Sequence, residues 1–272
     1  MNPSGAYAFF NHRRPICIGH RGAMGLAPEN TLASFQKAIE DGAEALEFDI
    51  RRSSDGEIVI IHDDTVDRTT NGRGDVRSLS LRDIKSLDAG YRLTPDGGKS
   101  FPWRGRGIEV PTLEEFFLSF PDAKAIVEIK QSPDSIVKAA IQMICRFGRG
   151  DRVILASEED RTMALVREEL RDRGLQIATG FSFGEVAAFI HWVRGGRASP
   201  FTPAGQAFQI PSEYGDITLV DRQSLKAAHA LELEMYVWTV NEPEEMERLL
   251  RLGVDGIITD YPERLEQILR GR

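Results

Sequence analysis

The chain has 272 residues and a formal net charge of −8, with 41% hydrophobic and 28% charged residues. This length suits one large α/β barrel or two small domains, and the composition is that of an ordinary globular protein. The acidic balance, with no basic run interleaved with aromatic residues, argues against a nucleic-acid-binding protein.

The cysteine content, the N-terminus and the hydropathy predict a cytoplasmic protein without a transmembrane segment. No apolar run of 18 residues occurs, so no transmembrane helix is expected. The N-terminal sequence MNPSGAYAFFNHRRP lacks a basic region followed by an apolar stretch, so no signal peptide is expected. Cys17 lies in an apolar segment and is expected to be a core residue, not half of a disulfide with Cys145.

Strand-like and helix-like segments alternate along the chain. Each of eight apolar, β-branched runs is followed by a segment with helical periodicity. The pairs Thr112/Glu115 and Ser182/Glu185 have capping-box spacing and predict helix starts, and Ser132-Pro133 predicts another. The predicted strands are centred near residues 17, 47, 127, 154, 178, 209, 237 and 257.

Eight strand–helix units favour a parallel sheet closed into a (β/α)8 TIM barrel, formed by residues 1–272 as one domain. The alternative is an open doubly wound sheet, which usually carries a G-x-G-x-x-G loop after its first strand. The segment GHRGAMG that follows the first predicted strand lacks this pattern. The barrel is therefore the preferred prediction.

One long segment interrupts the alternation. A short strand over residues 57–61 ends at His62, and residues 63–111 then follow, rich in Gly, Pro, Asp and Arg, with one short helix expected near 80–88. Connections of this length inside a compact domain are usually functional or disordered. Because it directly follows a histidine at a strand end, we predict that this insertion caps the active face of the barrel.

Three carboxylates are expected to enter the barrel from two neighbouring strands. Alternate residues of a strand share a face, which places Glu47 and Asp49 together in ALEFDI, and Glu128 with Lys130 in AIVEIK. Two such charges about 4 Å apart repel by roughly 4 kcal/mol at an effective dielectric near 20. Oxygen ligands favour Mg²⁺ or Ca²⁺, and such a cation would relieve the repulsion. Alternatively, Arg21 and Lys130 neutralise the acids without a metal.

Two histidines end apolar strands at the rim where barrel active sites lie. His20 follows the first strand and His62 follows the short strand after the second. Imidazoles titrate near neutrality and can act as a general acid and base, and the guanidinium of Arg21 suits a phosphate. Together with a metal, these groups predict phosphoryl transfer or phosphodiester cleavage. The histidines expected to be structural are His12, His191 and His229.

The sequence resembles the glycerophosphodiester phosphodiesterase family in IGHRGAMGLAPENTLASFQKAIEDGAEALEFDIRRSSDGEIVIIHDDTVDRTTNGRG and in SLDAG, VPTLEE, VEIK, VWTVN and GIITDYP. The resemblance covers nearly the whole chain and implies a TIM barrel with residues 63–111 as the family's insertion. It implies hydrolysis of small glycerophosphodiesters to sn-glycerol 3-phosphate and an alcohol, with one divalent cation, Mg²⁺ or Ca²⁺. The residues to which it gives roles are His20 and His62 (catalysis), Glu47, Asp49 and Glu128 (metal), Arg21 and Lys130 (phosphate), and Trp238 (substrate pocket).

Other activities stay open at this point. A lysophospholipase D-like activity on lipid substrates would use the same groups. A metal-dependent lyase or aldolase would also use Mg²⁺ and carboxylates, but it fits two strand-end histidines less well. A non-enzymatic phosphate-binding protein is expected to have lost a histidine or a metal ligand, and this chain keeps the full set. Direct attack by water and attack by the glycerol 2-hydroxyl through a cyclic phosphate both fit.

Overall fold

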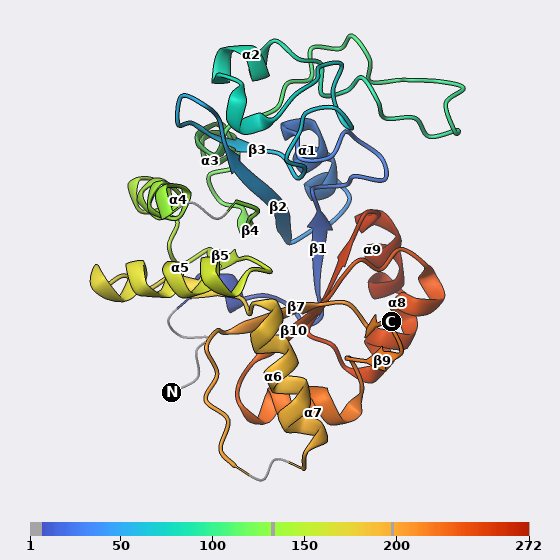
Figure 1. The fold of residues 1–272 in the computed structure, drawn as a ribbon. Helices are drawn as coiled ribbons and strands as arrows, with labels where there is room; N and C mark the ends of the chain where they lie inside the picture. Colours follow the sequence, from blue (N-terminus) through green and yellow to red (C-terminus); the bar gives the residue numbers. More distant parts are fainter. Residues whose placement is uncertain (1–6, 132–133, 197–198, 272) are drawn as a thin grey trace.

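The computed structural model describes residues 7–131, 134–196 and 199–271, and it shows a barrel of parallel strands surrounded by helices (Figure 1). The main strands are β1 (Ile16–His20), β2 (Ala45–Arg52), β4 (Lys124–Ile129), β5 (Val153–Ala156), β6 (Ala178–Thr179), β7 (Ala207–Ile210), β10 (Glu234–Val237) and β11 (Gly256–Thr259). The helices are α1 (Leu32–Glu40), α2 (Leu81–Lys85), α3 (Leu113–Ser119), α4 (Asp134–Arg146), α5 (Asp160–Asp172), α6 (Phe183–Arg194), α7 (Arg222–Ala230), α8 (Pro243–Leu252) and α9 (Pro262–Arg270).

The eight main strands pair in the order β6-β5-β4-β2-β1-β11-β10-β7. The two ends of this sheet meet at Gln206, whose backbone N–H donates to the Thr179 carbonyl at 2.9 Å while its side-chain oxygen accepts from the Thr179 N–H at 2.8 Å. Each main strand leads into a helix farther along the chain. The nearly closed (β/α)8 barrel therefore confirms the predicted fold.

Three short strands lie outside this series. β3 (Ile58–Ile60) confirms the short strand predicted before His62, and it pairs antiparallel with β2. β8 (Glu213–Tyr214) and β9 (Ile217–Thr218) form a small hairpin between β7 and α7. The hairpin lies at the end of β7 that carries active sites in barrels of this type.

Two layers of apolar side chains follow from strand alternation. Side chains from the outer strand faces pack against the helices, including Leu46, Phe48 and Ile50 of β2. The short helix η2 (Ala8–Phe10) adds two phenylalanines to the inner layer, and the Phe9 N–H donates to the Asp151 carbonyl, just before β5, at 2.8 Å. The inner layer consists of Phe9, Phe10, Ile16, Ile18, Ala45, Ile126, Ile154, Ala156, Ala178, Ala207, Tyr236 and Ile258.

Helix starts follow the local capping chemistry. Thr112 accepts from the Glu115 N–H at 3.1 Å, and the Glu115 carboxylate accepts from the Thr112 N–H at 2.7 Å, so this capping box is confirmed. The Glu185 carboxylate likewise accepts from the Ser182 N–H at 2.9 Å at the start of α6. The predicted start at residues 132–133 lies outside the described residues.

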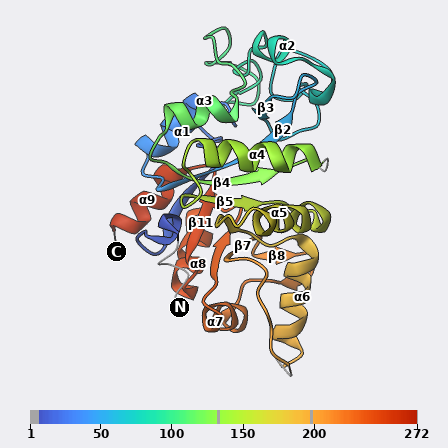
Figure 2. The same cartoon turned by 90° about the vertical axis from the view of Figure 1, so that its left-hand side faces the viewer.

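The helices turn apolar faces toward the strands, as their amphipathic sequences require. In Figure 2, α4, α5 and α6 follow one another along one side of the barrel, as do the strands β4, β5 and β6 that precede them. Within the described parts of the chain, no helix combines the length and the apolar character that crossing a membrane requires. The cytoplasmic location stays a prediction.

The long segment over residues 63–111 lies beyond α1 and α3 in both ribbon views (Figures 1 and 2). It contains η3 (Val76–Ser78) and α2, which lies within the range predicted for a short helix. Its own apolar side chains form a small core with residues of β3, and the Trp103 indole donates to the Leu26 carbonyl at 3.3 Å. The segment is thus packed on the loop after β1, and its function as a cap stays a prediction.

Candidate active site

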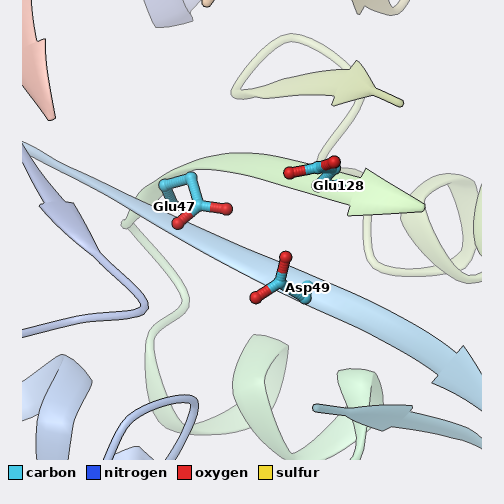
Figure 3. A group of neighbouring side chains, drawn as sticks. All are labelled: Glu47, Asp49 and Glu128. Carbon is cyan, nitrogen blue, oxygen red and sulfur yellow. The ribbon is translucent and has the colours of Figure 1, made fainter. Parts of the chain in front are cut away.

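Three carboxylates meet inside the barrel at neighbouring strands (Figure 3). Glu47 and Asp49 lie two residues apart on β2, and Asp49 is the register partner of Glu128 on β4. Each contributes one oxygen to a group in which all the atoms lie within 4.8 Å of one another. The predicted inward orientation of these side chains is confirmed, because strand alternation turns their neighbours outward.

Burial makes this cluster electrostatically costly. Glu47 and Asp49 are buried, and burial followed by the charge of Asp49 raises the pKa of Glu47. Burial is also the largest cause that raises the pKa of Glu128, although the Lys130 ammonium opposes it. A set of carboxylate oxygens at this spacing is the donor chemistry that hard divalent cations prefer. The three residues therefore fit a divalent cation.

Two cations lie beside the acids without neutralising all of them. Lys130 Nζ lies 2.7 Å from Glu128 Oε1 and 3.5 Å from Asp49 Oδ1. Arg21 Nε lies 3.3 Å from Asp49 Oδ2, while its Nη1 donates to Glu29 Oε1 at 2.8 Å. The three carboxylates of the cluster thus face two cations, one of which also binds Glu29. The pairing predicted as the alternative to a metal is present, but it leaves an excess of negative charge.

The turn after β1 positions Arg21. This residue adopts a φ of 47°, and its N–H donates to Glu47 Oε2 at 3.0 Å. A Cβ on the following Gly22 would lie 2.4 Å from Ser34 Oγ, so the tight turn requires glycine there. Arg21 Nε is buried and donates no hydrogen bond to any described residue. Arg21 Nε is therefore ion-paired with Asp49 but makes no hydrogen bond among the described residues.

His20 ends β1 and lies next to the carboxylates. Its Nε2 lies 3.9 Å from Glu47 Oε2, and its Nδ1 lies 2.6 Å from Asp260 Oδ1. Asn241 holds Asp260 through Nδ2, which donates to Asp260 Oδ2 at 2.7 Å. Burial lowers the pKa of His20, but the hydrogen bond to Asp260 and the charge of Glu47 outweigh it, and the net shift is upward.

His62 follows β3 and has a similar carboxylate partner. Its Nδ1 lies 2.7 Å from Asp63 Oδ1, and Arg68 Nε donates to Asp63 Oδ2 at 2.6 Å. Arg68 also donates to Glu29, the partner of Arg21. Burial opposes ionisation of Asp63, but hydrogen bonds from Arg68 and His62 lower its pKa to about 2. Ion pairs thus connect His62 with the carboxylate cluster.

Trp238 lies directly after β10 and is partly buried against the inner core layer. The backbone N–H of Trp238 donates to the Ile210 carbonyl at 3.1 Å. Period-two alternation would place Trp238 on one strand face with Tyr236 and Val240, but β10 ends at Val237 and Val240 packs in the outer core. Alternation does not extend past the strand end, and the pocket role of Trp238 stays a prediction.

Two histidines outside this cluster make ion pairs at the opposite end of the barrel. His12 Nε2 lies 3.0 Å from Glu234, at the start of β10, and His229 Nε2 lies 2.9 Å from Asp255, just before β11. These contacts support the structural role predicted for both residues.

The structure adds several residues to the site that the sequence did not predict. Asp260 and Asn241 follow β11 and β10, so the strand-end pattern that identified His20 could have found them. Asn30 donates to Asp49 Oδ2 at 2.9 Å from a loop, and Glu29 precedes it. No periodic pattern marks a loop residue, so these two had no comparable signal.

Comparisons with known proteins agree with this geometry. The model of the "Glycerophosphoryl diester phosphodiesterase family" matches residues 20–264. A glycerophosphodiester phosphodiesterase of Caldanaerobacter subterraneus is 32% identical over 94% of this chain and 98% of its own. A human lysophospholipase D is 25% identical over 93% of this chain and 85% of its own.

Solved structures show the same fold. The glycerophosphoryl diester phosphodiesterase domain of a Mycobacterium tuberculosis protein aligns with a TM-score of 0.83 at 22% identity, over 94% of this chain and 100% of its own. An Oleispira antarctica phosphodiesterase in complex with the product sn-glycerol-3-phosphate aligns with a TM-score of 0.74 at 24% identity, over 94% of this chain and 97% of its own.

Proposed function

This chain belongs to the glycerophosphoryl diester phosphodiesterase family, a family of phosphoric diester hydrolases, and we propose that it hydrolyses small glycerophosphodiesters to sn-glycerol 3-phosphate and an alcohol. The meeting of Glu47, Asp49 and Glu128 beside Arg21 and His20 carries this proposal. This arrangement combines a cation site, a phosphate-binding cation and a proton-transfer group within one end of the barrel.

Glu47, Asp49 and Glu128 would hold one divalent cation, Mg²⁺ or Ca²⁺. Their oxygen chemistry and their uncompensated negative charge support the assignment. When bound, such a cation supplies positive charge against the negative charge that develops on the phosphate. Asn30 keeps Asp49 in place by donating to one of its oxygens, which leaves the other toward Lys130.

His20 and His62 would exchange protons with the nucleophile and the leaving alkoxide. Each imidazole has a carboxylate at Nδ1, which fixes the ring and leaves Nε2 for the substrate. Proton transfer by such a group contributes typically about 10²–10⁴-fold to the rate. The nucleophile is water or the glycerol 2-hydroxyl, and either one needs a base placed at this rim.

Arg21 and Lys130 would bind the non-bridging phosphate oxygens. Both side chains already lie against carboxylates, and the Nε–H of Arg21, which makes no hydrogen bond among the described residues, would donate to the phosphate. A phosphate adds anionic acceptors that these cations bind in a charge-assisted way. Trp238 would contact the rest of the substrate from the end of β10.

The first experiment measures glycerol 3-phosphate release from glycerophosphocholine, glycerophosphoethanolamine and glycerophosphoglycerol. Each substrate is assayed with Mg²⁺, with Ca²⁺ and with EDTA. Metal-dependent release that EDTA abolishes supports the proposal and ranks the alcohols. Absence of release under every condition would refute it.

Cleavage of lysophospholipids is a second candidate function, since the human relative is a lysophospholipase D. The same site chemistry serves both reactions, because the reacting bond is a phosphodiester in each. Parallel assays with lysophosphatidylcholine discriminate the two, and activity on the lysolipid alone would replace the first proposal.

A further inference from the structure

Arg68 lies between two carboxylates that belong to different parts of the candidate active site. Its Nε donates to Asp63 Oδ2 at 2.6 Å, and its Nη2 donates to Asp63 Oδ1 at 3.1 Å. On the other side, Nη1 donates to Glu29 Oε2 at 2.6 Å and Nη2 donates to Glu29 Oε1 at 2.8 Å. The guanidinium therefore binds each carboxylate through two hydrogen bonds, a geometry that adds both strength and direction to such pairs.

Each of these carboxylates also contacts a group to which we assign a role in the reaction. Asp63 Oδ1 lies 2.7 Å from Nδ1 of His62. Glu29 Oε1 accepts from Arg21 Nη1 at 2.8 Å. A continuous chain of polar contacts thus runs from the proposed proton-transfer histidine to the proposed phosphate-binding arginine, and Arg68 is its central member.

The turn that carries Arg68 is anchored on both sides. Val66 and Thr70 are buried, and the N–H and the hydroxyl of Thr70 donate to the Val66 carbonyl at 3.1 and 2.7 Å. The Val66 N–H donates to the Gly74 carbonyl at 3.0 Å. The Arg68 side chain is 47% exposed, so water screens part of its charge. Because the backbone beneath it is fixed, the guanidinium can join the two carboxylates without ordering the turn.

Glu29 is shared by two arginines, and this sharing affects how Arg21 can bind a phosphate. Among the residues whose positions are described, the Glu29 carboxylate accepts hydrogen bonds only from Arg21 and Arg68. Burial opposes ionisation of Glu29, but the hydrogen bonds and charges of the two arginines lower its pKa. Without Arg68, the whole charge of Glu29 would face Arg21 and would compete with a phosphate for that guanidinium.

We propose that Arg68 is a positioning residue that serves both ends of this chain of contacts. Through Asp63 it holds the imidazole of His62 in one orientation. Through Glu29 it keeps Arg21 available to a phosphate. The inference rests on the proposed function for the roles of His62 and Arg21, and it gives the segment over residues 63–111 a defined contribution to the site.

Replacing Arg68 by glutamine should have two separate effects. Asp63 loses its two fixed donors, and because a misplacement of about 1 Å can cost about 10²-fold in rate, kcat should fall about 10- to 100-fold. Glu29 then pairs with Arg21 alone, and the affinity for phosphate should fall about tenfold, which corresponds to one hydrogen bond to a charged group. Arg68→Lys should recover only part of both losses, since an ammonium group cannot form two bidentate pairs at once.

A second substitution separates the two effects. Replacing Glu29 by glutamine in the Arg68→Gln protein removes the charge that captures Arg21, so the phosphate affinity should return to within about threefold of the wild type. The kcat should stay low, because Asp63 still lacks its donors. A residue that only stabilised the fold would not give recovery of binding without recovery of rate.

The experiment combines calorimetric titration with inorganic phosphate in the presence of Mg²⁺ and steady-state hydrolysis of glycerophosphocholine. Arg73→Gln is the matched control, because Arg73 is exposed in the same segment and makes no hydrogen bond or ion pair with any residue that the structure describes. This control should keep the wild-type affinity and kcat. Circular dichroism and Tm verify that every variant folds.

The outcomes distinguish this proposal from the proposed function. Equal phosphate affinity in the wild type and in Arg68→Gln, or a double variant that binds as weakly as the single one, would overturn the role of Arg68. Full activity of Arg68→Lys, or a wild type that binds no phosphate, would also overturn it. A protein that shows the expected order of phosphate affinities but cleaves no diester would refute the proposed function alone.

Discussion

Replacing Asp260 by asparagine should reverse the proton arrangement on His20. Asn241 Nδ2 donates to Asp260 Oδ2, so an asparagine at position 260 must turn its oxygen toward Asn241. Its amide NH₂ then faces His20 Nδ1, which lies 2.6 Å from Oδ1 in the native protein. Nδ1 must accept a hydrogen bond, and the ring proton moves to Nε2. His20 can then no longer take a proton at the substrate side.

The size of the loss follows from this reversed tautomer. A positioned general base or acid contributes about 10²–10⁴-fold. The same exchange of carboxylate for amide in the serine-protease triad costs about 10⁴ in kcat. We expect Asp260→Asn to lower kcat by about 10³-fold while KM changes little, because the Asp260 carboxylate bonds His20 and Asn241 and not the three clustered carboxylates. Asp260→Ala should be less damaging, since it removes the orientation without imposing the wrong tautomer.

The assay is steady-state hydrolysis of glycerophosphocholine at saturating metal, with Tm measured for each variant. The order of activity should be wild type, then Asp260→Ala, then Asp260→Asn. If Asp260→Asn retains activity within about threefold of the wild type, the assignment of a proton-transfer role to His20 through this pair is wrong. A lower Tm with normal kcat would assign Asp260 a purely structural role.

The remaining predictions concern the second histidine, the metal and stability. His62→Ala should lower kcat by about 10²–10⁴-fold. Metal at about 100 times Kd should add about 2.7 kcal/mol of stability and raise Tm by about 5 °C, and Glu128→Gln should remove this gain. Metal affinity should fall with falling pH, because burial and neighbouring carboxylates raise the pKa of Glu47 and Glu128 and protons compete there. The Asp255 hydrogen bond raises the pKa of His229 against the opposing effect of burial, so this pair should stabilise the fold below about pH 6.5 and lose its effect as the pH rises through the higher folded value.

These outcomes are checked by kinetics, calorimetric metal titration and denaturant unfolding at several pH values. His191→Gln, on α6 away from the cluster, is the control for His62→Ala and should keep full activity. His229→Gln removes the titrating group, so its free energy of unfolding should lack the component that declines above about pH 6.5. Parallel pH curves for this variant and the wild type would contradict the assignment.

The sequence by itself determined the barrel and the inner carboxylates. The alternation of eight apolar runs with helical segments needs only local periodicity, and a parallel sheet with these connections closes as the structure shows. The inward orientation of Glu47, Asp49 and Glu128 follows from the two-residue period of a strand. The positions of the strand ends could be predicted equally well, because a polar residue directly after an apolar run marks the rim of the barrel.

Only the tertiary structure decided which polar groups meet at that rim. Asp260 reaches His20 across 240 positions because closure of the barrel places the last strand beside the first. Arg68 reaches Glu29 from a segment without strand or helix periodicity. The contact between the Phe183 and Tyr214 rings likewise joins the start of α6 with a hairpin after β7. Periodicity describes one element at a time, whereas these contacts depend on how distant elements are brought together by closure of the sheet.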